Sequence, residues 1–456
     1  MAERPAIPGP PAERVPLATI AAEWGRIGVI GFGGPPAHIV LLRKLCVDKR
    51  RWLPAPEFED GIAATNLLPG PASTQLAIFC AWRLRGAAGA IVGGVCFIVP
   101  GLVIILALSA LFLAGHPPLW VRGAAAGAGA AVPAVAVNAA VSLLPASWQR
   151  TTGRRAARWR WLAYLAAGAV AGATAGELLV AVLLACGLAE VAIAHRSGPG
   201  KPAGGARGWL PAAAWLARGR SGPAASAAAW LVRRGVESGS AASAGALPTA
   251  RSLARAAPAM AGSALARVGS TAGPALAAGG LGALAWVAIK VGALSFGGGF
   301  VIIPLMQHDA VVTYHWMTGG QFLNAVALGQ VTPGPVVLTV AVVGYAAAGI
   351  AGGLLAVLIA FLPSFVFVIA GGPHFGALRS SGRVQSLLTG ARPAAIGAIA
   401  GAAIPLGRDL GHQWQAGVLL LAAAWLLALR KGIVPALLCA AALGIIAALA
   451  GAPISR

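Results

Sequence analysis

The chain has 456 residues, of which 58% are hydrophobic and 10% are charged, and its mean hydropathy is +0.80. This composition excludes a soluble globular protein, because there is too little polar surface to cover a water-exposed fold of this length. The formal net charge of +22 lies in loops between apolar runs, as in the cytoplasmic loops of membrane proteins, so nucleic acid is not an expected partner. We therefore expect an all-α integral membrane protein.

In chain order, the sequence divides into an N-terminal tail (1–16), a first membrane repeat (17–194), a linker (195–275) and a second membrane repeat (276–456). The tail lacks the apolar segment of a cleaved signal peptide. The linker is rich in Gly, Ala, Ser and Pro and carries ten Lys or Arg against one acid. We expect this basic linker to be loosely structured and to lie in the cytoplasm.

The two membrane segments are copies of one unit. With an offset of 264 residues, Gly28, Phe32, Gly33, Gly34, Trp52, Phe58, Pro69, Gly70 and Pro71 fall on Gly292, Phe296, Gly297, Gly298, Trp316, Phe322, Pro333, Gly334 and Pro335. Internal duplication in an apolar chain is typical of transporters, whose binding sites lie where the repeats meet.

The loop charges predict that the two repeats are inverted in the membrane. The loop after the first glycine motif carries basic residues from Arg43 to Arg51, whereas the matching loop, 305–321, has no Lys or Arg. Because basic loops stay in the cytoplasm, one loop is expected inside and its counterpart outside. The same rule predicts that 61–82 enters and leaves on one side, broken or re-entrant at Pro-Gly-Pro, and that 161–194 forms a helical hairpin.

The first repeated motif is Gly31–His38, which is echoed by Ser295–Phe300. Glycine and proline within an apolar span leave backbone groups without partners, and a membrane tolerates these only where protein, water or a ligand meets them. A tight helix crossing is the structural alternative, but the recurrence favours a binding role. The substrate-binding candidates from this motif are Phe32, Gly33, Gly34, Phe296, Gly297 and Gly298.

The second repeated motif is Asn66–Gln75, which is echoed by Gln330–Thr339. A Pro-Gly-Pro sequence interrupts a span and can leave the second proline at the first position of a half-helix, whose free N–H groups attract an anion. A structural kink lined by small polar residues is the alternative. The candidates from this motif are Asn66, Pro69, Gly70, Pro71, Ser73, Thr74, Gln330, Thr332, Pro333, Gly334 and Pro335.

Three cations lie within apolar spans. Arg26 and Lys290 occupy matching positions before each Phe-Gly-Gly, whereas Arg392 has no cation at the matching position of the first repeat. Cations in a membrane usually face an acid, a water-filled cavity or an anionic substrate, so all three are anion-ligand candidates. The alternative for the first two is snorkelling to the interface, and Glu23 is the acid nearest to Arg26.

Enzyme and metal chemistry are not expected from the sequence. It has no spaced Cys/His set, nucleophile elbow or P-loop, and the scattered cysteines are expected to be small buried hydrophobes. His38 and Glu177 are the titratable proton-coupling candidates, although an interfacial histidine is the plainer interpretation of His38.

Five segments in the same order resemble the chromate ion transporter (CHR) family in its long form with two fused halves: Phe32–Ile39, Arg50–Leu53, Asn66–Thr74, Phe296–Gly299 and Thr332–Pro335. The resemblance implies proton-coupled export of chromate and chromate resistance, in a multi-pass protein of the bacterial inner membrane. Asn and Glu are common in the family where Ala72 and Gln75 stand here, which makes Gln75 a further proton-coupling candidate.

The resemblance implies no cofactor. The expected partners are the chromate or sulfate anion and membrane lipid, and a homodimer is left open. The alternatives are a transporter of sulfate or another divalent oxyanion and, from a different class, a membrane-embedded enzyme or a structural membrane protein.

Overall fold

A computed structural model describes residues 15–66, 68–113, 117–151, 155–174, 178–196, 280–295, 299–372 and 381–454. Within these ranges all regular secondary structure is helical, which confirms the all-α class. In the described part of the chain, five helical segments are long and apolar enough to cross a membrane: Ala72–Phe112 (α4), Leu119–Trp148 (α5), Leu179–Arg196 (α7), Val336–Gly371 (η6 with α14) and Gly382–Arg408 (α16). Almost all of the tail and the linker lies outside the described residues.

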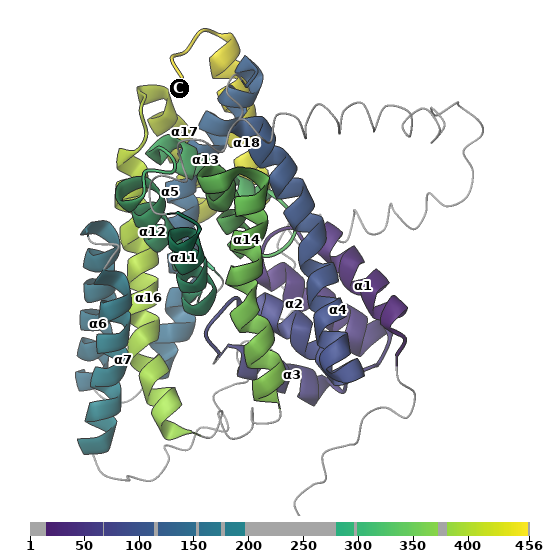
Figure 1. The fold of residues 1–456 in the computed structure, drawn as a ribbon. Helices are drawn as coiled ribbons and strands as arrows, with labels where there is room; N and C mark the ends of the chain where they lie inside the picture. Colours follow the sequence, from purple (N-terminus) through teal and green to yellow (C-terminus); the bar gives the residue numbers. More distant parts are fainter. Residues whose placement is uncertain are drawn as a thin grey trace, which may run out of the picture.

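The beginnings of the two repeats have the same order of helices (Figure 1). The first repeat contains α1 (Leu17–Ile30), α2 (Pro35–Arg43), η1 (Lys44–Lys49) and α3 (Ala55–Thr65) before α4. The second contains α11 (Gly280–Leu294), α12 (Ile302–Gln307), η5 (His308–Thr313) and α13 (Gly319–Val331), followed by η6 (Val336–Leu338) and α14 (Thr339–Gly371).

Local backbone features recur at matching positions. Both η1 and η5 are π-helical, and each is followed by a residue with φ of 51°, Arg51 and His315. Both α4 and α14 are kinked at a glycine with positive φ, Gly86 (61°) and Gly349 (63°). The spacing is 264 residues at the first feature and 263 at the second, so the second copy is one residue shorter than the first between these two features. The inverted orientation in a membrane stays a prediction.

Helix α3 and the start of α4 form a hairpin around the first Pro-Gly-Pro. The two ends are joined by an ion pair between Glu57 in the first turn of α3 and Arg83 of α4. Helix α3 ends at Thr65. Pro71 is the N-cap residue of α4, whereas the sequence predicted it as the first residue of that helix, so the helix begins one residue later, at Ala72. This geometry fits a segment that enters and leaves on one side, although sidedness itself stays a prediction.

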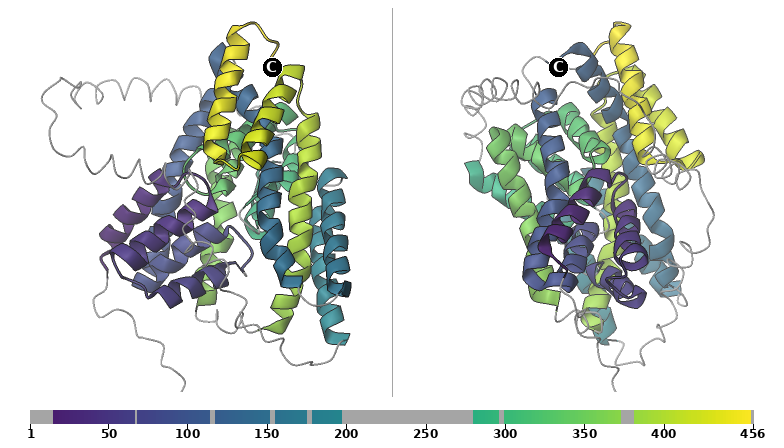
Figure 2. Two further views of the ribbon diagram at one scale, coloured as in Figure 1. Left: turned by 180° about the vertical axis from the view of Figure 1, so that it is seen from behind. Right: turned by 90° about the vertical axis from the view of Figure 1, so that its right-hand side faces the viewer.

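Each repeat packs its last two helices on the other repeat. The first repeat's α6 (Arg155–Thr174) and α7 lie along α16, and the second repeat's α17 (Gln413–Ala423) and α18 (Ile433–Leu449) lie along α5. Figures 1 and 2 show the two groups, α6 with α7 beside α16 and α17 with α18 around the upper part of α5. The repeats are therefore interlocked rather than placed side by side.

Small residues permit this close packing of helices. Gly168 and Gly172 of α6 and Gly397 and Gly401 of α16 each face the backbone of the other helix, and a Cβ at any of them would overlap it. Two small residues four positions apart on each helix are the usual means of bringing membrane helices into backbone contact. The glycine-rich composition is thus explained in part by packing.

The crossing of α6 and α16 gives a stability prediction. A methyl group at Gly397 would overlap the carbonyl oxygen of Leu165, so Gly397→Ala should separate the helices and cost about 1–3 kcal/mol. We expect a lower melting temperature of the detergent-solubilised protein. Gly407→Ala, on the same helix with open space around the glycine, is the control and should leave stability unchanged or higher. Equal melting temperatures for both variants would contradict this packing.

Three expectations about individual residues need correction. Glu23 pairs with Arg50, at 2.7 Å between Oε1 and Nη2, and not with Arg26, because the turn after η1 brings Arg50 back towards α1. Cys439 is exposed on α18 rather than buried, and Cys96 is partly exposed. His38 is fully buried rather than interfacial, because α2 packs against α4.

Candidate functional site

A cavity of about 200 Å³ lies beside the first Pro-Gly-Pro break. The end of α3, the break and the start of α4 form one wall, and α5, α7, Val301 and α16 form the others. The lining residues are Thr65, Asn66, Leu68, Gly70, Ala72, Leu143, Ala146, Ser147, Leu183, Val301, Leu388, Ala391, Arg392, Ala395, Ile396 and Ile399. Both repeats therefore contribute to one cavity.

The break itself is held by local hydrogen bonds and packing. The Gln75 side chain donates from Nε2 to the carbonyl oxygen of Pro69 at 2.6 Å. Gly70 has φ of 119°, and an added Cβ would lie 2.5 Å from Gln75 Nε2 and 3.1 Å from Ser364 Oγ. Only glycine fits this turn without strain. Gln75 is therefore buried as a support of the loop.

Of the described residues that line the cavity, Arg392 alone is charged. It lies on α16, within a span apolar enough to cross a membrane, and is partly exposed. Asn66 adds an exposed side-chain amide, while the Thr65 hydroxyl donates to the carbonyl of Gly61 (2.9 Å) and Ser147 accepts from the Trp161 indole (2.9 Å). A guanidinium in a small, mostly apolar cavity attracts an anion with several oxygen acceptors.

The second Pro-Gly-Pro is closely packed in this structure. The Gly334 N–H donates to the carbonyl oxygen of Gly31 at 3.1 Å, and Pro333 lies against the backbone of Gly101. Thr332 is buried and bonds to its own helix, while Gln330 is buried at the position that matches Asn66. The residues from Gln330 to Pro335 do not line the Arg392 cavity, and their role as anion ligands stays a prediction.

His38 connects the first glycine motif to the start of α4. Its Nε2 lies 2.9 Å from the carbonyl oxygen of Gly31, its Nδ1 lies 3.3 Å from Ser73 Oγ, and its ring packs edge-on against Phe97. The imidazole is therefore enclosed by protein on all sides, and Thr74 is buried beside Ser73. A proton-coupling role for His38 stays a prediction.

The glycine motifs contact the second break rather than the cavity. Phe32 and Gly33 are exposed, and Gly34 faces Val336 immediately after the second Pro-Gly-Pro. Four further candidates, Phe296, Gly297, Gly298 and Glu177, lie outside the described residues.

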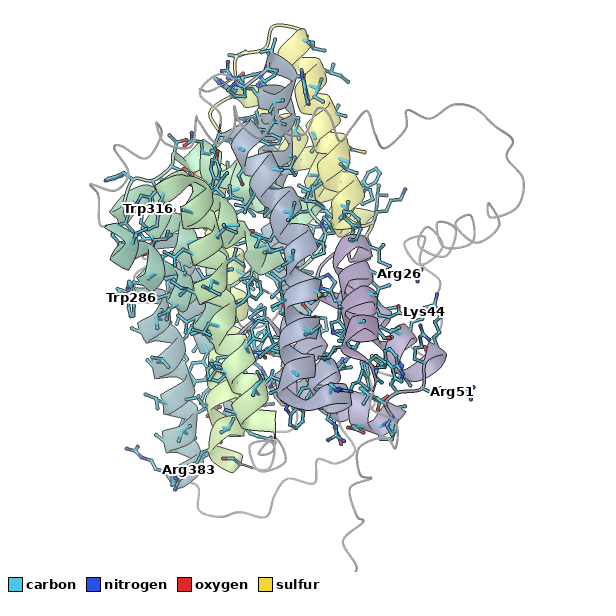
Figure 3. The ribbon with its side chains drawn as sticks, turned by 45° about the vertical axis from the view of Figure 1, so that its right-hand side comes forward. Arg26, Lys44, Arg51, Trp286, Trp316 and Arg383 are labelled. Carbon is cyan, nitrogen blue, oxygen red and sulfur yellow. The ribbon has the colours of Figure 1, made fainter. Side chains whose placement is uncertain are left out.

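The two aligned cations have different surroundings. Arg26 is exposed on the outer side of α1. Lys290 contacts the ring of Trp286 in α11, and Trp286 lies on the opposite side of the molecule from Arg26 (Figure 3). Lys290 Nζ forms an ion pair with Asp309 Oδ2 at 2.6 Å, and both side chains are largely buried. Neither cation lines the cavity, so Arg392 is the candidate cation that the structure places there.

A second cavity, of about 760 Å³, lies at the other end of α5 and α16. Its wall includes Arg122, Gly129, Asn324 and Asp409, and the Asp409 carboxylate accepts a hydrogen bond from Gln307 Nε2 at 2.6 Å. Burial raises the pKa of Asp409, and the hydrogen bond opposes this rise. The sequence motifs gave no indication of this cavity, since its residues belong to none of them.

The two cavities show that α5 and α16 run antiparallel. The C-terminal part of α5 (Leu143, Ser147) meets the N-terminal part of α16 (Leu388, Arg392), and the N-terminal part of α5 shares the second cavity with Asp409 at the end of α16. Matching helices of inverted repeats are expected to have this relation.

Among the described residues there are five long apolar helices, and four of them (α4, α5, α7 and α16) line a cavity that both halves share, an arrangement typical of a multi-pass membrane transporter. The chain belongs to the chromate transporter family, whose model matches residues 18–191 and 282–449, that is, both repeats without the linker.

Curated relatives extend over most of the chain. It is 28% identical to the chromate transport protein of Cupriavidus metallidurans, over 84% of this chain and 80% of the relative. It is 26% identical to the probable chromate transport protein of Synechococcus elongatus, over 88% of each, and 28% identical to the chromate transport protein of Pseudomonas aeruginosa, over 85% and 80%. No solved structure matches the chain significantly.

Proposed function

We propose that this protein exports chromate across the bacterial inner membrane, in exchange for protons, and so confers chromate resistance. Arg392 in the cavity beside the first Pro-Gly-Pro break is the observation that carries the proposal. There the guanidinium, the Asn66 amide and the start of α4 face one space that both repeats enclose. Chromate, a tetrahedral dianion, offers oxygen acceptors to all three groups.

The position of the cavity suits binding of the anion from the cytoplasmic side. The cavity borders the N-terminal part of α16, and Arg383 at the start of α16 lies towards the same end of the molecule as Arg51 (Figure 3). Under the positive-inside rule this basic end faces the cytoplasm. The state described here then receives its substrate from inside.

The membrane potential favours export of a dianion. An inside-negative potential contributes about 2.3 kcal/mol per charge per 100 mV, so moving two negative charges outward gains roughly 4.6 kcal/mol per 100 mV. Uptake of the same ion would have to overcome this free energy. Sulfate presents the same oxygen geometry and charge, so it is the alternative substrate.

The test is chromate flux in everted membrane vesicles that contain the protein. We expect chromate to accumulate in the vesicles, excess sulfate to compete weakly, and an ionophore that collapses the proton gradient to reduce the flux. Vesicles without the protein are the control. No flux of chromate above that control would refute chromate export, stronger transport of sulfate would support the alternative, and unchanged flux with the ionophore would refute only proton coupling.

A further inference from the structure

The second cavity lies at the far end of the helix that carries Arg392. Its wall includes Asp409, the C-cap residue of α16, together with the start of α13 and the N-terminal part of α5. Arg392 and Asp409 are 17 residues apart, which corresponds to roughly 25 Å along a helix. One helix therefore connects a cation in the first cavity to an acid in the second.

The Asp409 carboxylate is held between two other helices. Gln307 of α12 donates from Nε2 to Asp409 Oδ2 at 2.6 Å. A Cβ added at Gly319, the first residue of α13, would lie 2.7 Å from both carboxylate oxygens. The carboxylate thus lies at the N-terminus of α13, where the helix dipole favours a negative charge. Its charge strengthens the contacts of α16 with both α12 and α13.

The charge of Asp409 is not fixed by an ion pair. Of the described residues that line the cavity, Arg122 of α5 is the other charged one, and its Nη2 donates to the carbonyl oxygen of Ile454 at 3.3 Å. No ion pair joins Asp409 to a cation in the described part of the chain. Helices α12 and α13 contain no charged residue and no histidine. The other titratable or charged groups close to Asp409 or Gln307 in the chain are Arg408, His412, His308 and Asp309, which is paired with Lys290.

Asp409 is placed to exchange a proton with the side opposite to the basic end of the molecule. Burial raises its pKa, although the residue is still partly exposed. Trp316, which precedes Thr318 of the cavity wall in the chain, lies towards the opposite end of the molecule from Arg51 and Arg383 (Figure 3). Under the positive-inside rule the second cavity then faces the outer side.

We propose that Asp409 carries the proton that is exchanged for chromate, and that this proton enters through the second cavity from the outer side while Arg392 binds chromate from the inner side. The inference rests on the proposed function, since it names the residue for proton exchange. A movement of α16 relative to α12 and α13 then exposes each end of the helix to the opposite side. Chromate is released outside and the proton inside, so the two ions are exchanged simultaneously at separate sites.

The proton changes the contacts that hold α16 in the present state. Water on the outer side gives a proton to a carboxylate oxygen of Asp409, and no other covalent bond forms or breaks. The hydrogen bond from Gln307 then loses its charged acceptor, and α13 loses the negative charge at its N-terminus, so both contacts become weaker. On the inner side the proton passes to water, and the carboxylate can form both contacts again.

The first test follows proton movement during chromate transport. In everted vesicles, whose lumen corresponds to the outer side, chromate entry should be accompanied by proton exit, which a trapped pH-sensitive dye reports as alkalinisation of the lumen. In Asp409→Asn we expect loss of this chromate-dependent alkalinisation, whereas exchange of labelled for unlabelled chromate continues. Asp48→Asn, which removes an exposed acid outside both cavities, is the control and should behave like the wild type.

The pH dependence of chromate exchange separates a proton carrier from a structural carboxylate. With equal pH on both sides, wild-type exchange should fall as the pH rises through the pKa of Asp409, because fewer molecules carry the proton. Asp409→Asn is permanently neutral, so its exchange should not show this fall. Gln307→Met removes the hydrogen bond to the charged form, which raises the pKa of Asp409 further, and the fall should move to higher pH. The ionisation of chromate itself is the same for all variants.

Two results would overturn the role of Asp409 while chromate export stands. One is wild-type alkalinisation in Asp409→Asn, and the other is loss of both chromate exchange and alkalinisation in that variant, which would make the carboxylate structural. Chromate flux without any alkalinisation in the wild type would refute proton coupling, and the role of Asp409 with it.

Infrared difference spectra of the purified protein test Asp409 without any transport assay. On acidification we expect a band of a protonated carboxyl group that is missing in Asp409→Asn. Identical spectra of the two proteins would refute a proton site at Asp409. If the band is present but the wild type transports no chromate, the proposed function fails and the proton site remains.

Discussion

Replacing Arg392 by glutamine is expected to abolish most chromate transport while leaving the protein folded. A hydrogen bond from a charged donor contributes about 1.5–3 kcal/mol, which corresponds to roughly 10- to 150-fold in Kd for the anion. The side chain lines the cavity and is not fully buried, so its loss should affect stability little. Chromate binding to the purified protein and flux in vesicles both measure the effect.

Arg383→Gln is the matched control for this prediction. Arg383 lies on the same helix but is exposed at its start, outside the cavity (Figure 3). Both substitutions remove one positive charge from α16, so a general electrostatic effect would appear in both. Equal chromate affinity in the two variants would show that the cavity cation is not an anion ligand.

Removing the charge of Lys290 is expected to destabilise the protein more than removing the charge of Arg26. The Asp309 side chain is 8% exposed, and Lys290→Gln would leave its carboxylate buried without a cation. Breaking one partner of a buried ion pair typically costs about 3–5 kcal/mol. We expect a marked fall in the melting temperature of the solubilised protein.

The double variant Lys290→Gln with Asp309→Asn removes both charges and should recover much of this loss. Arg26→Gln, at an exposed position on α1, should leave the melting temperature near that of the wild type. If Lys290→Gln instead kept its stability but lost chromate transport, Lys290 would act on the substrate and not as the structural partner of Asp309.

The sequence was sufficient for features that depend on local chemistry. The membrane class follows from composition, and the ends of α3 at Thr65 and of α13 at Val331 lie shortly before the two Pro-Gly-Pro sequences. Asn66, Gly70 and Arg392 were all candidates, and the structure brings them to one cavity. Ser147, on the same cavity wall, carried no motif that could have identified it.

What the sequence left open depends on which helices meet. Lipid tails are as apolar as the helices, so hydropathy does not determine the neighbours of a membrane helix. The packing of α6 and α7 on α16 was therefore not predictable, and without it the position of Arg392 relative to the break could not be deduced. For the same reason Arg50, and not Arg26, is the partner of Glu23.

The packing of each repeat's last two helices on the other repeat has a consequence for the origin and assembly of the protein. A polypeptide made of one repeat would lack the long helix that its last two helices cover here. Helices α6 and α7 of the first copy cover α16 of the second, and α17 and α18 of the second cover α5 of the first. A single-repeat ancestor would have needed to dimerise before it was complete. Joining both copies in one gene sets their stoichiometry at one to one, and each copy was then free to diverge from the other, as the exposed Arg26 and the ion-paired Lys290 at matching positions illustrate.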